Sequence, residues 1–192
     1  MPKRVGGLLP ILILTFTATI VTASDDRLIT EFSADGAGLG WYVVNDGVMG
    51  GRSAGGFEIV DGLLRFSGRT NTRGGGFSSI RSGRLNLDLS TYEGIRLRVL
   101  GDGRRYTLRL ATEARYRGIP IGYWSDIETE KEAWVTVELP FDTFVPQVRG
   151  MRLEGPSLDT TGIVEMGLMI YDGEDGPFEL SVDRIETYRP QP

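Results

Sequence analysis

Two groups of closely spaced carboxylates are the side chains in this sequence best suited to acid–base chemistry. The groups are Glu128, Glu130 and Glu132, and Asp172, Glu174 and Asp175. Two carboxylates at a fixed separation can cleave a glycosidic bond if an apolar setting raises the pKa of one of them. Neither group has such a setting in the sequence, so we interpret both as solvated loop acids.

The composition removes most other catalytic mechanisms. The chain has no cysteine and no histidine, which excludes a thiolate nucleophile, a Ser-His-Asp triad and a zinc finger. Calcium held by oxygen ligands is the metal that remains, but no stretch has the acid spacing of a calcium loop. Asp183, near the end of the last predicted strand, is the one residue that we consider for a structural calcium. We therefore expect no enzyme activity, no cofactor and no metal, and a fold that keeps its stability in a chelator.

Glycine-rich stretches lie at residues 41–53, 73–81 and 101–106. They lie between predicted strands and lack the helix and lysine of a phosphate-binding loop, so tight turns explain most of the glycines. Turns do not explain Asn45 and Asp46 beside Met49, or Arg81 after an apolar run. We expect residues 46–53 and 74–81 to lie next to each other on neighbouring strands. Asp46 should then serve mainly the shape of the domain, with Met49 pointing inward.

Short alternating runs predict the elements that position these residues. The runs are residues 63–66, 95–99, 106–110, 134–139, 166–171 and 178–182. Period-two alternation is typical of half-buried strands, and no segment shows a sustained helical period. The turn at residues 101–103 predicts that strands 95–99 and 106–110 form an antiparallel hairpin. The pattern indicates an all-β sandwich in one domain, residues 24–192.

Alternation in this hairpin would place Arg96, Arg98 and Arg109 on one exposed face, opposite a core face of aliphatic residues. Three arginines on a sheet face could dock an acidic protein or an anionic glycan. They could equally provide solubility, with Glu138 as a cross-strand partner.

Three aromatic residues, Tyr116, Tyr123 and Trp124, lie in or beside a predicted inter-strand loop. They could form a platform on which a sugar ring stacks, or they could pack as a satellite core at the end of the sandwich.

The N-terminal segment resembles a targeting sequence. Lys3 and Arg4 precede an apolar run that ends in small residues, which predicts a signal peptide at residues 1–23 and cleavage before Ser24. The alternative is an uncleaved membrane anchor. We expect an exported protein, periplasmic or extracellular, that contacts a membrane only if this segment is retained. The formal net charge of −5 disfavours nucleic acid as a partner.

The order and spacing of several motifs resemble the complex I intermediate-associated protein 30 family. Besides the three glycine-rich stretches, the resemblance rests on Trp134, residues 139–141, Phe144, Arg149-Gly150 and residues 176–185. It covers residues 32–188. It implies a galactose-binding-like jelly roll and an assembly factor that holds intermediates of the respiratory NADH dehydrogenase, with no catalytic residues. The mitochondrial factor works in the matrix, so export would place this chain on the opposite side of the membrane.

The sequence therefore predicts a non-catalytic domain that binds another protein, such as an assembly intermediate. The alternative is a carbohydrate-binding module of the cell envelope. The candidate binding residues are Asn45, Asp46, Arg81, Arg96, Arg98, Arg109, Tyr116, Tyr123 and Trp124.

Overall fold

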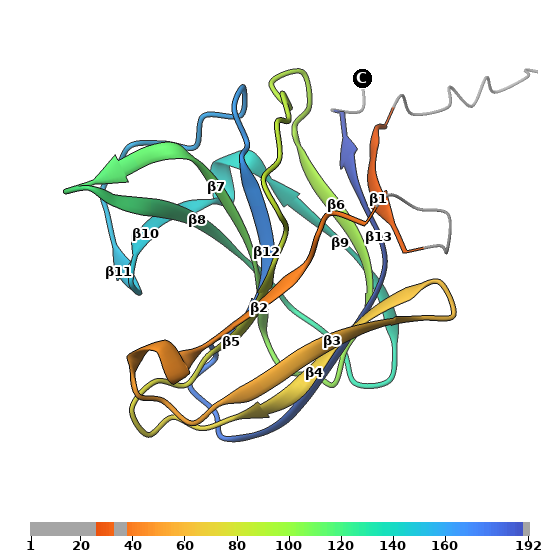
Figure 1. The fold of residues 1–192 in the computed structure, drawn as a ribbon. Helices are drawn as coiled ribbons and strands as arrows, with labels where there is room; N and C mark the ends of the chain where they lie inside the picture. Colours follow the sequence, from red (N-terminus) through yellow and green to blue (C-terminus); the bar gives the residue numbers. More distant parts are fainter. Residues whose placement is uncertain (1–25, 33–37, 190–192) are drawn as a thin grey trace, which may run out of the picture.

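A computed structural model describes residues 26–32 and 38–189. The predicted signal peptide, residues 1–23, lies outside the described residues. Within the described ranges, no helix is long and apolar enough to cross a membrane. The fold is all-β, as predicted, with two sheets that face each other across one core (Figure 1).

Sheet A has the strand order β3-β4-β13-β6-β9, and β1 also pairs with β13. Its strands are β1 (Leu28–Glu31), β3 (Ala54–Val60), β4 (Leu63–Thr70), β6 (Gly94–Leu100), β9 (Trp134–Pro140) and β13 (Gly176–Tyr188). Every pairing in this sheet is antiparallel.

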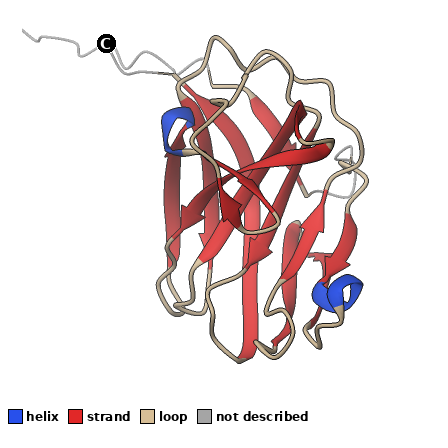
Figure 2. Ribbon diagram, turned by 90° about the vertical axis from the view of Figure 1, so that its left-hand side faces the viewer, coloured by secondary structure: helices blue, strands red, loops and turns tan. Residues whose placement is uncertain are grey.

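Sheet B has the strand order β11-β10-β8-β7-β12-β5-β2. Its strands are β2 (Tyr42–Asn45), β5 (Ser78–Arg81), β7 (Tyr106–Tyr116), β8 (Ile119–Ile127), β10 (Val145–Val148), β11 (Met151–Arg152) and β12 (Glu165–Ile170). Two short 3-10 helices, η1 (Asp46–Met49) and η2 (Phe141–Thr143), lie at the periphery (Figure 2).

The core lies between the two sheets and follows the predicted alternation. Leu97 of β6 and Leu108 of β7 are fully buried, as are their apolar neighbours two residues away. Because strand side chains alternate between faces, the intervening residues point away from this core. Truncating either leucine to alanine would cost about 2–5 kcal/mol of folding free energy.

The predicted hairpin between residues 95–99 and 106–110 is wrong. β6 pairs with β9 and β13 in sheet A, whereas β7 pairs with β8 and β12 in sheet B. Residues 101–105 therefore carry the chain from one sheet to the other. The two strands contribute leucines to the same core from opposite sides, which is why both alternate in the same way.

The predicted neighbourhood of residues 46–53 and 74–81 is confirmed. β2 and β5 pair antiparallel, with Asn45 opposite Ser78. The main-chain N–H of Asp46 also donates to the Phe77 carbonyl at 3.3 Å.

Candidate functional site

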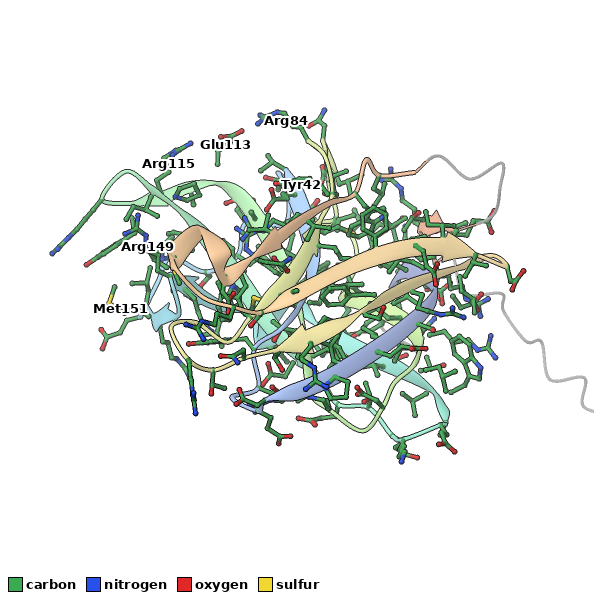
Figure 3. The ribbon with its side chains drawn as sticks, turned by 60° about the horizontal axis from the view of Figure 1, so that its bottom comes forward. Tyr42, Arg84, Glu113, Arg115, Arg149 and Met151 are labelled. Carbon is green, nitrogen blue, oxygen red and sulfur yellow. The ribbon has the colours of Figure 1, made fainter. Side chains whose placement is uncertain are left out.

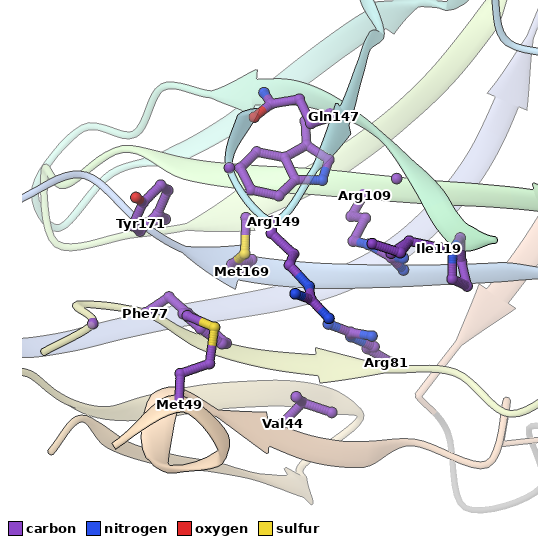
Figure 4. A pocket seen from close by; sticks show the side chains of 15 residues that line it. Val44, Met49, Phe77, Arg81, Arg109, Ile119, Gln147, Arg149, Met169 and Tyr171 are labelled. Carbon is purple, nitrogen blue, oxygen red and sulfur yellow. The ribbon is translucent and has the colours of Figure 1, made fainter. Parts of the chain in front are cut away.

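A pocket of about 310 Å³ lies on the outer face of sheet B, at the lower end of the range of about 300–1,000 Å³ for ligand pockets. Its side chains are mainly apolar or aromatic, with three arginines and one glutamine. They include Val44, Met49, Phe77, Arg81, Arg109, Ile119, Pro120, Trp124, Gln147, Arg149, Met169 and Tyr171 (Figure 4). No Asp, Glu or Lys is among the pocket-lining residues in the described part of the chain.

Strand register sets the centre of this site. Paired residues on adjacent strands form one row across the sheet: Trp124, Arg109, Gly167, Arg81 and Tyr42. Paired residues of antiparallel strands point to the same face, so all the side chains in this row face away from the core. Gly167, in the middle of the row, has no side chain, and a Cβ at this position would lie 2.7 Å from the Ile80 carbonyl oxygen.

Glu165 neutralises part of the positive charge beside the pocket. Its carboxylate pairs with Arg109, accepts a 2.9 Å hydrogen bond from the Tyr42 hydroxyl, and lies 4.0 Å from Arg81 Nη1. Burial, followed by repulsion from Arg81, holds the pKa of Arg109 below its ordinary value, while Glu165 opposes this shift. Partial burial and the bond to Glu165 raise the pKa of Tyr42. Arg109 is thus held by one acid inside the domain.

The other two arginines keep unused capacity. The Nε atom of Arg81 is buried, and no hydrogen-bond partner for it is found in the described part of the chain. Arg149 is exposed, and no ion pair with it is found within residues 26–32 and 38–189. Figure 4 shows both side chains directed toward the same part of the pocket, so the site has an excess of positive charge.

One wall of the pocket is formed by η1 and the loop before β5, and Asp46 holds these two segments together. The side chain of Asp46 is fully buried. Its carboxylate accepts hydrogen bonds from the Ser53 N–H (2.9 Å), the Ser53 hydroxyl (2.6 Å) and the Gly76 N–H (2.7 Å). Burial alone would raise the pKa of Asp46, but these hydrogen bonds outweigh it and hold the pKa below its ordinary value. The structure therefore supports the predicted role of Asp46 in the shape of the domain.

Met49 differs from the prediction. We expected an inward side chain, but Met49 is 58% exposed and lies at the mouth of the pocket. It ends η1, which projects from the sheet, so its apolar side chain has no core within reach. Asn45 is a structural tie, because it donates to the Gly55 carbonyl and accepts from the Ser78 hydroxyl at 2.6 Å.

The prediction that three arginines share one exposed face is wrong. Arg96 and Arg98 belong to sheet A, whereas Arg109 belongs to sheet B and is 8% exposed. Arg96 pairs with Asp26, Glu186 and the predicted partner Glu138. Arg98 pairs with Asp183 at 3.0 Å and lies over the Trp134 ring. Their binding role stays a prediction, and these contacts within the chain reduce the charge that they offer.

The three aromatic residues of the predicted platform do not lie together. Tyr123 is fully buried in the core. Tyr116 lies half-buried at the end of β7, beneath the Arg117 guanidinium. Trp124 alone lines the pocket, where its ring is perpendicular to that of Tyr171 at a centroid distance of 6.1 Å. Successive residues of a strand face opposite sides, which separates Tyr123 from Trp124.

Sequence reasoning named Arg81, Arg109 and Trp124 but missed most of the pocket, including Phe77, Arg149, Met169 and Tyr171. Met169 and Tyr171 could have been found, since alternation places them opposite the core residues Leu168 and Ile170. Arg149 carries no such signal, because it lies in the turn between β10 and β11 with a positive φ of 50°. Arg149 and Met151 lie together at one edge of the molecule (Figure 3).

The carboxylate groups fit the predicted loop role with one exception. Glu128, Glu130, Glu132, Glu174 and Asp175 are exposed. Asp172 is not a solvated acid, because its side chain is 5% exposed and forms a two-bond ion pair with Arg104. Across the described ranges, no group of three or more potential metal ligands gathers, and Asp183 pairs with Arg98 and Arg184.

Comparison with known proteins shows the family of this chain. The profile of the complex I intermediate-associated protein 30 family matches residues 30–182. The chain belongs to this family, which confirms the resemblance predicted from its motifs. A comparison with curated protein sequences gave no significant match.

Solved structures show the same fold. The family 11 carbohydrate-binding module of the cellulase Lic26A-Cel5E of Clostridium thermocellum is 18% identical, with a TM-score of 0.63, over 88% of this chain and 97% of the module. The Clostridium thermocellum family 11 module in complex with a β-1,3-1,4-mixed-linked tetrasaccharide gives 17% identity, a TM-score of 0.63, and coverage of 88% and 98%. The agarase AgWH50C gives 12% identity and a TM-score of 0.57, over 86% of this chain and 25% of the agarase. At these identities the similarity shows the fold alone.

Proposed function

We propose that this chain is a non-catalytic domain that holds a partner protein at the pocket of sheet B. The family name suggests the kind of partner, an assembly intermediate of complex I. The observation that carries the proposal is the composition of the pocket. It combines arginine, methionine and aromatic side chains and contains no lysine or acid among the described lining residues.

This composition is typical of protein–protein interfaces. Their buried centres are enriched in Tyr, Trp, Phe, Met and Arg and depleted in Lys, Glu and Asp. Met49 and Tyr171, at 58% and 46% exposure, present large flexible or amphipathic side chains to solvent. Methionine adapts to irregular partner surfaces, while tyrosine supplies area with little entropy loss.

The location of the partner follows from the expected export signal. If residues 1–23 direct export, the pocket meets partners in the periplasm or outside the cell. If the segment is retained, the domain is held close to the membrane surface, within reach of membrane complexes.

A carbohydrate-binding role is the second candidate, supported by Trp124 and Gln147 in the same pocket. An indole can stack on a sugar ring, and an amide can bind its hydroxyls. Arg81 and Arg149 can donate to hydroxyl oxygens, but the pocket offers few side-chain acceptors for hydroxyl protons, because the nearby Glu165 is already bonded to Arg109 and Tyr42. A protein partner therefore fits the site better.

Photo-crosslinking tests the two candidates in the organism that makes the protein. Tyr171 is replaced by p-benzoyl-phenylalanine, and the matched control carries the same residue at Ile59 on sheet A, which is equally exposed at 47%. We expect a discrete protein adduct from position 171 only, and slower appearance of assembled complex I on native gels when the gene is deleted. A glycan adduct, or equal adducts from both positions, would contradict a protein-binding pocket on sheet B.

A further inference from the structure

Resting on the proposed protein-binding function, we propose that the pocket recognises an acidic peptide segment of the partner. A carboxylate of that segment binds between Arg81 and Arg149, and the neighbouring apolar side chain packs against Met49, Phe77 and Trp124. The site is thus specific for an Asp or Glu beside a large apolar residue.

Charge complementarity is the first observation behind this proposal. The pocket has three arginines, and Glu165 engages mainly Arg109. The charge of Arg149 is unpaired within the described part of the chain. The Arg81 side chain is 26% exposed, and its Nη1 lies 4.0 Å from Glu165, which is too far for a hydrogen bond. An incoming carboxylate can therefore accept charge-assisted hydrogen bonds from both guanidinium groups.

The rest of the molecule strengthens the selectivity of this site. The whole chain is acidic, with a formal net charge of −5, so an acidic segment is repelled over much of the surface. On sheet A, Arg96 is surrounded by Asp26, Glu138 and Glu186. In the pocket of sheet B, arginines exceed acids among the described lining residues, and such local complementarity steers a charged partner and fixes its orientation.

The apolar lining decides between an acidic peptide and an acidic sugar. Met49, Phe77, Val44, Ile119 and Met169 offer aliphatic and aromatic carbon around the arginines. A phenylalanine or leucine side chain gains from burial against such a surface. The hydroxyls of a uronic acid would lose their water there and find Gln147 as the main uncharged partner.

Two blocked dipeptides probe the site directly on the full-length protein. N-acetyl-Asp-Phe-amide carries the carboxylate, and N-acetyl-Asn-Phe-amide is its uncharged isostere. Binding is followed by NMR titration, with methyl glucuronide and methyl glucoside as the sugar arms. We expect the aspartyl peptide to bind at least about tenfold more tightly than the asparaginyl peptide, as for a hydrogen-bonded ion pair. The glucuronide should bind more weakly than the aspartyl peptide.

Three variants locate the effect. Arg149→Gln should lower the affinity for the aspartyl peptide by about tenfold and reduce the dependence of that affinity on salt. Arg81→Gln should do the same, whereas Arg65→Gln on β4 of sheet A, where Arg65 pairs with Glu58, should leave the affinity unchanged. A thermal melt of each variant establishes that the domain is folded.

Equal binding of the two dipeptides would overturn the carboxylate proposal, as would preferential binding of the glucuronide or no binding of the aspartyl peptide. The proposed function fails separately, if crosslinking at position 171 gives no protein adduct. Adducts from position 171 together with equal dipeptide binding would mean that the pocket binds a protein without reading its charge.

Discussion

Asp46 and Ser53 are joined by two hydrogen bonds, one from the Ser53 N–H to Oδ1 at 2.9 Å and one from its hydroxyl to Oδ2 at 2.6 Å. The same Oδ2 accepts from the Gly76 N–H at 2.7 Å. A side chain at Gly51 or Gly75 would collide with this carboxylate, since a Cβ would lie 2.2 Å from its nearest atom at the first position and 2.5 Å at the second. The glycines of these two stretches therefore make room for a buried acid.

Asp46→Asn should destabilise the domain by about 1–3 kcal/mol at pH 7, because the amide N–H₂ faces donors that need an acceptor. The folded pKa of Asp46 is lowered, so its stabilisation is present above the unfolded pKa of about 3.9 and lost as pH falls through the folded pKa. The difference in the free energy of unfolding between the wild type and the variant should thus be smaller at about pH 3 than at pH 7. Urea unfolding at both pH values measures this.

The matched control for that experiment is Asp61→Asn, an exposed turn residue with no partner in the described contacts. It should change the free energy of unfolding by less than about 0.5 kcal/mol. Equal stability of Asp46→Asn and Asp61→Asn would contradict a stabilising role for the hydrogen bonds that Asp46 accepts.

Arg104→Gln should lower the free energy of unfolding by about 3–5 kcal/mol, because it leaves a buried carboxylate without its partner. Arg104 donates to both oxygens of Asp172, at 2.8 and 2.7 Å, and to the carbonyls of Glu174 and Pro177 at 2.9 Å. The double variant with Asp172→Asn should recover part of the loss, as measured by a double-mutant cycle in urea. Additive effects of the two substitutions would show that the pair is not coupled.

Gly122→Ala should displace two side chains of the pocket. A Cβ at this position would lie 2.7 Å from Arg109 Nε and 2.8 Å from Trp124 Nε1, so the buried guanidinium and the indole ring must both shift. We expect affinity for N-acetyl-Asp-Phe-amide to fall several-fold, measured by NMR titration alongside a thermal melt. Gly56→Ala on β3, where nothing lies within 4 Å, is the control and should bind normally.

Arg96→Glu should destabilise the domain, because the Arg96 guanidinium is paired with three acids. Its Nη1 lies 2.7 Å from Asp26 and 3.4 Å from Glu186, and the Arg96 side chain is 21% exposed. Charge reversal would place a fourth acid among three, so the melting temperature should fall, and salt should restore part of it by screening. Arg98→Glu, with one ion pair and 43% exposure, should show a smaller fall. Equal melting temperatures for both variants would contradict this difference.

Alternation predicted what lies inside the sandwich but not how the strands are ordered. Leu97 and Leu108 were correctly placed in the core, since period two depends only on neighbouring residues. Their assignment to one hairpin was wrong because β6 pairs with β13, a strand far along the chain, and not with β7. Arg81 and Arg109 were named as site residues, yet their meeting across Gly167 depends on the same distant pairings. The place of Arg149 in the pocket could not be predicted from alternation, because it depends on the geometry of the turn between β10 and β11.

The row Trp124, Arg109, Gly167, Arg81 and Tyr42 crosses five strands whose sequence positions span most of the domain. A fragment that lacks any of these strands cannot reproduce it, so the site depends on the complete row of sheet B. Any ligand held by that row adds its binding free energy to the global unfolding equilibrium, by about 2.7 kcal/mol at a concentration of 100 Kd. A rise in melting temperature therefore reports any ligand of the folded domain, those of this pocket included, whatever the chemical identity of the molecule.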